Sequence, residues 1–224
     1  MNQRMQASHG PAPTGFVRLV SFSGMDGAGK STQIAALRAA LEAEGLRVRI
    51  VTFWDDVACL KGLREASSHT LFKSEKGVGR PDAPVNRRDK NVRSAPMTLV
   101  RLGLYLLDAL SLRVVVRRML RSPVDCVICD RYCYDELANL DLRRGPERLY
   151  ARLILALTPR PGAPIILDAV PAEARARKPE YPPDFLEFSR ESYARLAALA
   201  GLIVVPPGSP GAVSRRVLDA VRSR

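Results

Sequence analysis

A glycine-rich segment at residues 24–31 constrains the fold of this chain more than any other feature. Its sequence is Gly-Met-Asp-Gly-Ala-Gly-Lys-Ser, which fits the pattern GxxxxGK[ST]. It follows the apolar run VRLVSFS (17–23) directly, and it precedes the Ala- and Leu-rich run STQIAALRAALEAEG directly. A strand, a glycine loop and a helix in this order form a phosphate-binding loop, because free backbone N–H groups of the loop and of the helix start converge on an anion.

Each part of this loop has a chemical task. Gly24, Gly27 and Gly29 let the backbone curl so that its N–H groups point inward. Lys30, expected to face solvent, would reach the β- and γ-phosphates as a compact cation, and the Ser31 hydroxyl would bind Mg²⁺. The segment therefore predicts that the chain binds a nucleoside triphosphate. It does not decide between kinase, GTPase and ATPase.

The rest of the chain alternates short apolar runs with longer helical patterns. Strands and helices in alternation predict an α/β fold of three layers, in which a five-stranded parallel sheet has helices on both faces. The strand candidates are apolar at nearly every residue, as a sheet covered on both faces requires. The predicted strands are 17–23, 47–53, 125–130, 164–170 and 202–205, and the later predicted helices are 97–121, 146–157, 184–200 and 209–222.

Two stretches interrupt this alternation. We expect a flexible tail at 1–15, followed by a single domain at 16–224. Residues 55–96 form a long polar and basic insertion, which we place near the acceptor site. The Pro-rich sequence RKPEYPPDF (177–185) separates two predicted helices, and residues 178–183 within it are expected to form a short lid over the site.

A second candidate site lies at the end of the run VDCVICDRY. Ligands of open α/β sheets bind beyond the carboxyl ends of the strands, where Asp130 and the glycine loop would meet. Asp130 could hold Mg²⁺ together with Ser31, and Arg131 could bind an acceptor phosphate with two hydrogen bonds. The alternative for this pair is a salt bridge at the strand end. Asp168, within the predicted strand PIILDAV (164–170), is a weaker candidate of the same kind, with a structural role as its alternative.

The charge, hydropathy and cysteine content of the chain indicate which kinds of ligand and which compartment to expect. The chain has 35 Lys and Arg against 23 Asp and Glu, a net charge of +12, which favours an anionic ligand. Its most apolar segment, 97–120, is interrupted by charged residues and is not a membrane span. Cys126 and Cys129 form a CxxC, but on a strand they would face opposite sides of the sheet and could not share a metal. We therefore expect reduced thiols and a cytoplasmic protein.

Three segments together resemble the thymidylate kinases, a family of P-loop nucleoside monophosphate kinases. These are FSGMDGAGKSTQ, VICDRY, and ILDAVPAEARARK followed by EFSRESYARLA. The resemblance covers roughly residues 16–54, 97–142 and 164–222. It implies transfer of the γ-phosphoryl group of ATP to dTMP with Mg²⁺, small nucleotide substrates, and a homodimer formed through the long helix.

The resemblance also implies roles for individual residues. Asp26 would approach the acceptor sugar and Arg177 would pack on adenine. Asp130 and Arg131 would act, with Lys30, near Mg²⁺ and the acceptor phosphate. The residues that would bind ATP are Gly24, Asp26, Gly27, Ala28, Gly29, Lys30, Ser31, Thr32 and Arg177.

The chain departs from the family pattern on the acceptor side. Relatives commonly carry F-P-x-R after the second strand, with an arginine for the acceptor phosphate, whereas this chain has Phe53-Trp54-Asp55-Asp56. An arginine of the long helix that contacts thymine is replaced near Ala109, and a Tyr-Gln pair after DRY is missing.

Other residues could complete the acceptor site. Arg101, Tyr105 and Asp108 lie on one stripe of the long helix, and their alternative is a buried structural ion pair. Arg88 and Arg93 of the basic insertion could supply the missing phosphate contact, and their alternative is a solvated loop. Phe53 and Trp54 could stack on a base, although Phe53 could equally belong to the core.

Two other functions remain open from the sequence. The first is a kinase of the same fold that phosphorylates a different small anionic acceptor. The second is a non-catalytic nucleotide-dependent protein that binds nucleic acid through the basic insertion. Aromatic residues make up only 6% of the chain, and Phe72 is the only one in the insertion, which disfavours nucleic-acid binding by stacking.

Overall fold

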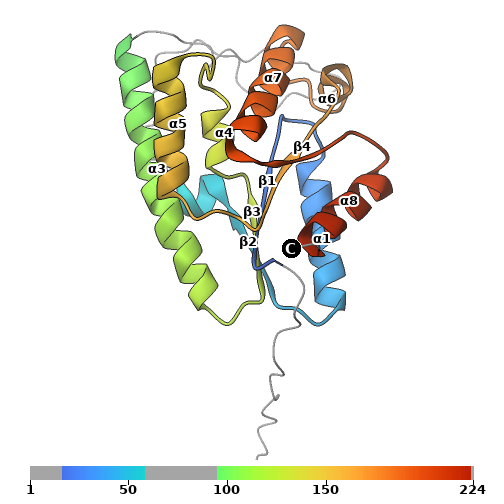
Figure 1. Ribbon diagram of the computed structural model, residues 1–224. Helices are drawn as coiled ribbons and strands as arrows, with labels where there is room; N and C mark the ends of the chain where they lie inside the picture. The colour runs from blue at the N-terminus through green and yellow to red at the C-terminus, as the bar shows by residue number, and fades with distance from the viewer. Residues whose placement is uncertain (1–16, 59–94, 223–224) are drawn as a thin grey trace, which may run out of the picture.

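The computed structural model describes residues 17–58 and 95–222, and it contains the predicted parallel sheet (Figure 1). Five strands pair in the order β2-β3-β1-β4-β5, and every pairing is parallel. The strands are β1 (Leu19–Ser23), β2 (Val48–Thr52), β3 (Cys126–Asp130), β4 (Ala163–Leu167) and β5 (Ile203–Val205). The prediction of a three-layer α/β fold with five parallel strands is confirmed.

The position of each strand explains its burial. β1 in the middle and β4 beside it are buried along their whole length, whereas the edge strands β2 and β5 are only partly buried. This gradient follows from coverage by helices, which is complete only at the centre of the sheet.

Helices cover the two faces of the sheet as separate layers. One face packs against α1 (Lys30–Ala43) and α8 (Pro210–Arg222), which are shown on the right of Figure 1. The other packs against α3 (Ala95–Arg121), α5 (Gly145–Leu157) and α7 (Pro183–Ala200). Cys126 belongs to the first core and Cys129 to the second, so the two thiols face opposite sides, as the strand pattern predicts.

Three short elements were not predicted. They are the π-helical turn η1 (Phe53–Val57), the helix α4 (Cys133–Leu137) and the helix α6 (Pro171–Arg177). Each is only a turn or two long and therefore carries too little hydrophobic periodicity to be recognised. All three follow a strand at its carboxyl end, so they lie at the edge where ligands bind in such sheets.

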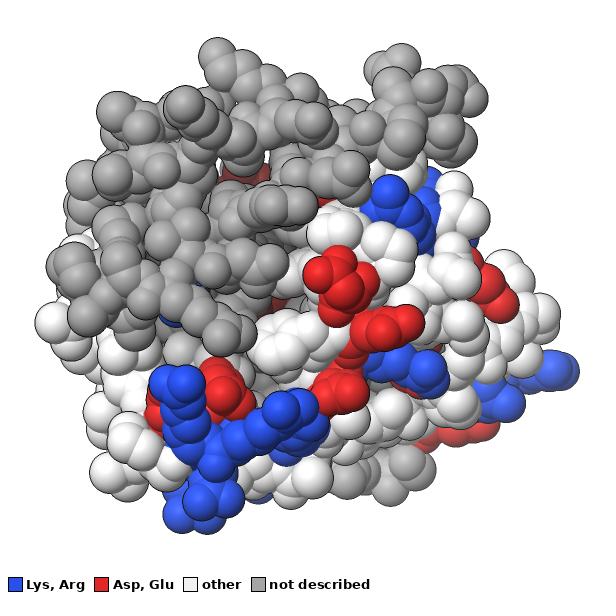
Figure 2. Space-filling model, turned by 90° about the horizontal axis from the view of Figure 1, so that it is seen from above, with Lys and Arg blue, Asp and Glu red and all other residues white. Residues whose placement is uncertain are grey.

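Figure 2 shows the molecule from above, where the strands end. On the described part of this face, Lys and Arg side chains are interspersed with Asp and Glu rather than gathered into one basic patch. The basic insertion is described only for residues 55–58 and 95–96, so the placement of Arg88 and Arg93 lies outside the described residues. Within 17–58 and 95–222, none of the helices has the length and apolar character needed to traverse a bilayer.

Candidate active site

The glycine loop after β1 packs closely on two neighbouring elements. Gly24 has φ 138°, and a Cβ atom there would lie 2.5 Å from the carbonyl oxygen of Leu167 at the end of β4. Gly27 has φ 84°, and a Cβ atom there would overlap the backbone of Ala174 in α6. Left-handed backbone and close approach together require glycine at both positions. The loop is therefore held against β4 and α6.

Lys30 lies inside this loop rather than facing solvent, which corrects the expectation from the sequence. Its side chain is 7% exposed, and Nζ donates to the carbonyl oxygens of Gly24 at 2.7 Å and Met25 at 2.9 Å. Burial, followed by the nearby positive charge of Arg131, lowers the pKa of Lys30 to about 8. The loop curls around the ammonium group and so places this cation where phosphates would bind.

A surface cavity beside the loop brings together most of the residues predicted to bind ATP. Ser31 and Thr32 begin α1, and Asp130 lies across from them at the end of β3. The predicted residues that line this cavity are Asp26, Gly27, Gly29, Lys30, Ser31, Thr32, Asp130, Arg131 and Arg177, joined by Lys178. Gly24 instead lines a second, adjacent pocket, and Ala28 packs partly against the core. We call the first cavity the donor cavity.

The donor set in this cavity fits a triphosphate with Mg²⁺. A hydroxyl at Ser31 and one carboxylate at Asp130 are oxygen ligands of the kind Mg²⁺ takes when phosphates supply the remaining oxygens. Among residues 17–58 and 95–222, no group of three His, Cys, Asp or Glu side chains could hold a metal by itself. Burial raises the pKa of Asp130, while the cations Arg131 and Lys30 oppose that rise.

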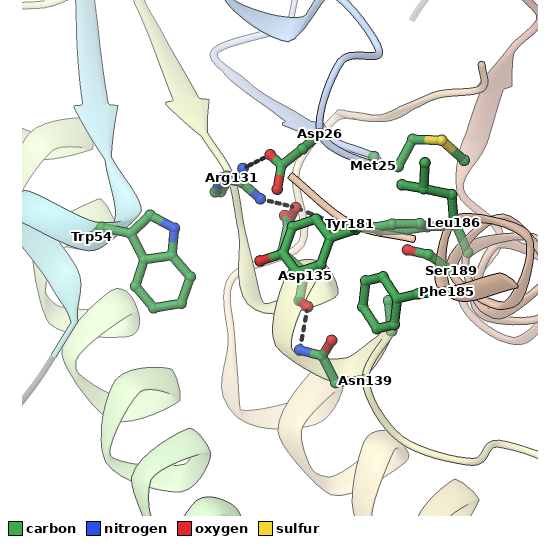
Figure 3. Close-up of a pocket in the computed structure, with 13 residues that line it drawn as sticks. Met25, Asp26, Trp54, Arg131, Asp135, Asn139, Tyr181, Phe185, Leu186 and Ser189 are labelled. Atoms are coloured by element: carbon green, nitrogen blue, oxygen red, sulfur yellow. Dashed lines mark hydrogen bonds and ion pairs between the residues drawn. The ribbon is translucent and has the colours of Figure 1, made fainter. Parts of the chain in front are cut away.

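The second pocket, shown in Figure 3, lies between the loop, α4 and the start of α7. Trp54 of η1 stands on one side, and the rings of Tyr181 and Phe185 stand on the other. These two rings stack at 4.8 Å between centroids. The full lining is Gly24, Met25, Asp26, Trp54, Arg131, Asp135, Ala138, Asn139, Tyr181, Phe185, Leu186, Ser189 and Tyr193. We call it the acceptor pocket.

Arg131 and Asp26 line both cavities and are bound to each other. One terminal nitrogen of Arg131, Nη2, donates to Asp26, and the other, Nη1, donates to Asp135 at 3.2 Å. Burial by itself lowers the pKa of the guanidinium, but the carboxylates of Asp135 and Asp26 raise it more, so Arg131 stays charged. The strand-end salt bridge considered for Arg131 is thus present, and its position at the junction of the two cavities is also that of a substrate contact.

Trp54, rather than Phe53, is the aromatic residue available to a ligand. The Phe53 side chain is 1% exposed and belongs to the hydrophobic core, whereas Trp54 is 40% exposed and lines the acceptor pocket. The two rings pack edge to face at 5.2 Å. Phe53 therefore supports Trp54 from behind, and the expectation that Phe53 itself contacts a base is corrected.

The polar stripe of α3 lies behind the acceptor pocket and does not line it. Asp108 is fully buried and Tyr105 nearly so, because this face of α3 packs on the core. The Tyr105 hydroxyl lies 3.4 Å from Nδ2 of Asn139, which does line the pocket. Arg101 is partly buried, and its Nε has no hydrogen-bond partner in the described part of the chain. Asp108 is therefore buried away from the acceptor pocket, and Tyr105 approaches the pocket through Asn139.

Asp168 also follows its structural alternative. Both of its oxygens bind Arg190 on α7, at 2.8 and 2.7 Å. This ion pair lies at the molecular surface and lines neither cavity.

Several pocket residues were missed by the sequence analysis. Asp135, Asn139 and Tyr193 had no motif to identify them, and Tyr181 and Phe185 were noted only as part of the Pro-rich sequence 177–185. The spacing of Asp135 from Arg131 was no signal either, because Arg131 lies before α4 with positive φ, where the helical i,i+4 rule does not apply.

Comparison with known proteins identifies relatives of this chain by sequence and by structure. No family model matches the chain. A thymidylate kinase from Deinococcus radiodurans is 31% identical over 180 residues, covering 75% of this chain and 73% of the relative. A probable thymidylate kinase from Methanosphaera stadtmanae is 28% identical over 196 residues, covering 85% and 89%.

A solved structure shows the same fold. The thymidylate kinase from Ehrlichia chaffeensis superposes with a TM-score of 0.55 at 15% identity, covering 91% of this chain and 97% of its own. At that identity the match supports the fold, while the 31% identity across most of both sequences supports the relationship. The chain belongs to the thymidylate kinase family.

Proposed function

We propose that this protein transfers the γ-phosphoryl group of ATP to dTMP, giving dTDP and ADP, with Mg²⁺ as the metal cofactor. The observation that carries the proposal is the shared wall of the two cavities, where Asp26 and Arg131 line both. A donor phosphate beside Lys30 and an acceptor phosphate beside Arg131 would meet at this wall. Phosphoryl transfer leaves little covalent chemistry to the protein, so such juxtaposition is the main catalytic requirement.

The residues of the donor cavity would act by position and charge. Backbone N–H groups of the loop and of the start of α1 would bind the β- and γ-phosphates, and Lys30 would neutralise charge on the γ-phosphate. When bound, Mg²⁺ would supply positive charge that stabilises the transferring phosphoryl group, and Ser31 and Asp130 are the residues that would hold it. Arg177, exposed at the end of α6, is placed to cover the adenine ring, and Lys178 of the proposed lid lies beside it.

The acceptor pocket would hold the nucleotide between aromatic walls. Trp54 on one side and the Tyr181–Phe185 pair on the other offer flat surfaces on which a base can stack. Arg131 would bind the acceptor phosphate, and Asp26 lies within reach of the sugar that follows it. Tyr181 of the proposed lid, residues 178–183, packs in one hydrophobic cluster with Met25 of the loop and Phe185 of α7, which supports a lid that would cover the substrates.

A coupled assay of ADP release across the nucleoside monophosphates tests the proposal, with dTDP identified by chromatography. We expect dTMP to be the preferred acceptor. The variant Arg131→Ala should raise the KM for dTMP and lower kcat, while the KM for ATP changes little. Turnover with a different small anion and none with dTMP would support the alternative same-fold kinase, and binding of ATP without any transfer would support the non-catalytic alternative.

A homodimer is part of the proposal. Apolar side chains Val100, Leu107, Leu110 and Val114 are exposed along α3, at spacings that place them on one side of the helix. Burial of this stripe against a second copy of α3 would remove it from water. Light scattering should give the mass of a dimer, and Val114→Glu should give the mass of a monomer. A monomeric wild-type protein at micromolar concentration would contradict this part of the proposal.

The cytoplasm is the proposed location. The described cysteines Cys126, Cys129 and Cys133 are all buried as free thiols. A reducing compartment maintains thiols in this form, and the proposed reaction needs the ATP found there.

A further inference from the structure

Asp135, in the first turn of α4, has a fully engaged carboxylate at the wall of the acceptor pocket. Its side chain is only 3% exposed. Oδ2 accepts hydrogen bonds from the Ser23 hydroxyl at 2.5 Å and from the backbone N–H of Tyr132 at 3.1 Å. Oδ1 accepts from the Tyr193 hydroxyl at 2.9 Å and from Nη1 of Arg131 at 3.2 Å. Each oxygen thus accepts hydrogen bonds from two donors. The four donors belong to β1, the β3–α4 connection and α7.

We infer that Asp135 is a positioning residue, which fixes the guanidinium of Arg131 so that this group can bind the acceptor phosphate. The inference rests on the proposed function, because it assigns Arg131 to the acceptor. Asp135 itself would act through Arg131 and need not touch the substrate. The residue is absent from the motifs that identify the family in this chain, and only the three-dimensional contacts point to it.

Arg131 needs such support because its backbone and side chain are both unusual. It is the one described non-glycine residue with positive φ, at 69°. A left-handed backbone is strained for any residue other than glycine, so surrounding contacts must hold it. Its guanidinium stands between two carboxylates, Asp26 on the loop and Asp135 on α4, as Figure 3 shows. The two acids fix the plane of the guanidinium from opposite ends.

The two carboxylates differ in how firmly they are held. Asp26 belongs to the loop that a triphosphate would contact, and its side chain is 13% exposed. Asp135 is anchored by three further donors that belong to the protein interior. An acceptor phosphate can therefore replace Asp26 on Nη2, while Asp135 keeps Nη1 in place. This asymmetry makes Asp135 the fixed support and Asp26 the exchangeable partner.

A carboxylate is required at this position because donors meet both of its oxygens. The variant Asp135→Asn keeps one acceptor oxygen and places an NH₂ group at the other position, so either Tyr132 N–H or Nη1 of Arg131 loses its acceptor, and the remaining oxygen carries no full negative charge for the guanidinium. The Ser23 hydroxyl can rotate to compensate, but the backbone and the guanidinium cannot. Asp135→Asn should therefore release Arg131 while changing the shape of the site very little.

The position of Arg131 can be measured without any assay of activity. In protein labelled with ¹⁵N-arginine, a guanidinium held by two carboxylates rotates slowly and gives separate Nη resonances, which the variant Arg131→Ala assigns. We expect these resonances in the wild type and their averaging in Asp135→Asn. The matched control is Asp125→Asn, just before β3, where Asp125 binds Arg47 through both oxygens at 2.9 Å and lines neither cavity. This control variant should release the guanidinium of Arg47 and leave the Nη resonances of Arg131 unchanged.

Kinetics then separate a positioning role from a structural one. Asp135→Asn should lower kcat/KM for dTMP by about ten- to a hundredfold, the cost of one hydrogen bond to a charged group, with little change in KM for ATP. In the Arg131→Ala background the same substitution should change kcat/KM by less than about twofold, because Asp135 would then have nothing to position. A purely structural Asp135, needed only to begin α4, would show the same loss in both backgrounds.

The outcomes keep this inference distinct from the proposed function. Averaged Arg131 resonances in the wild type, or unchanged ones in Asp135→Asn, would overturn the inference even in an active kinase. A wild type that does not phosphorylate dTMP would overturn the proposed function, and the resonances would still show whether Asp135 fixes Arg131. If Asp135→Asn does not fold, Tyr193→Phe and Ser23→Ala each remove one support of the carboxylate. Arg131 resonances unaffected by both would count against the inference.

Discussion

The buried ammonium of Lys30 should make the stability of this protein depend on pH in a way that one substitution removes. The ordinary pKa of a lysine is 10.5, and burial together with Arg131 lowers that of Lys30 to about 8. Below pH 8 the folded protein must keep a proton on a buried amine, which costs free energy. As pH rises from 8 toward 10.5 the folded state has lost this proton while the unfolded chain still holds it, so the cost declines.

The size of the effect follows from the two pKa values. At pH 7 the protonated amine reduces the free energy of unfolding by about 3 kcal/mol, since each pKa unit corresponds to about 1.36 kcal/mol. Near pH 9.5 the same linkage relation leaves a cost of about 1 kcal/mol. Wild type should therefore gain about 2 kcal/mol of stability over this interval, relative to a variant without the amine.

Lys30→Met is the matched substitution, because methionine keeps an unbranched side chain of similar length and removes the charge. Urea unfolding of both proteins at about pH 7 and about pH 9.5 gives four free energies of unfolding. The double difference is the gain in this free energy between the two pH values in the wild type minus the same gain in Lys30→Met. Burial also raises the pKa of Cys126 and Cys129 to about 12, so these thiols destabilise the folded state as pH passes 9, but equally in both proteins. A double difference near zero would show that Lys30 faces solvent, as the sequence alone suggests, and would refute the curled loop described here.

Three further predictions concern the substrates. Asp130→Asn should raise the Mg²⁺ concentration needed for half-maximal rate severalfold without changing the KM for dTMP, and an unchanged Mg²⁺ titration would remove Asp130 from the metal site. Trp54→Ala should weaken dTMP binding in calorimetry by about 1–3 kcal/mol, the cost of a lost stacking surface, and equal binding would show that the base lies elsewhere. Arg88→Ala or Arg93→Ala, outside the described residues, should weaken dTMP by about 1.5–3 kcal/mol and leave a non-hydrolysable ATP analogue unaffected. Equal loss for both ligands would indicate a non-specific charge effect instead.

The donor half of the site could be predicted because its determinants are contiguous in the sequence. The strand at 17–23, the loop and the start of α1 follow one another without interruption, and the chemistry of phosphate binding needs that order. The parallel sheet follows in the same way from apolar runs alternating with helices. Even here, the sequence did not predict the burial of Lys30, because its contacts depend on how the loop curls.

The acceptor half could not be predicted because several segments far apart in the sequence build it. Trp54 comes from η1, Arg131 from the connection after β3, Asp135 from α4, and Phe185 and Tyr193 from α7. Choosing Trp54 over Phe53 requires knowing which side of a π-helical turn packs on the core, and no periodic pattern reveals this in five residues. Residue type narrowed the candidates, and packing between distant segments selected among them.

Charge balance explains why an acceptor phosphate and Asp26 should compete for Arg131. The described side chains that line the acceptor pocket include one cation, Arg131, and two carboxylates, Asp26 and Asp135. A dianionic phosphate entering this pocket meets a net negative lining unless a carboxylate withdraws or further positive charge arrives. Asp26, which binds Arg131 and lies 4.0 Å from Lys30, is the carboxylate we expect to withdraw, because interior donors hold Asp135 in place. Displaced from Arg131, Asp26 would turn toward the sugar hydroxyl groups of the acceptor, which can donate hydrogen bonds to it. One exchange of partners would thus bind the phosphate and orient the sugar, and it would occur only when the acceptor carries a phosphate to drive it.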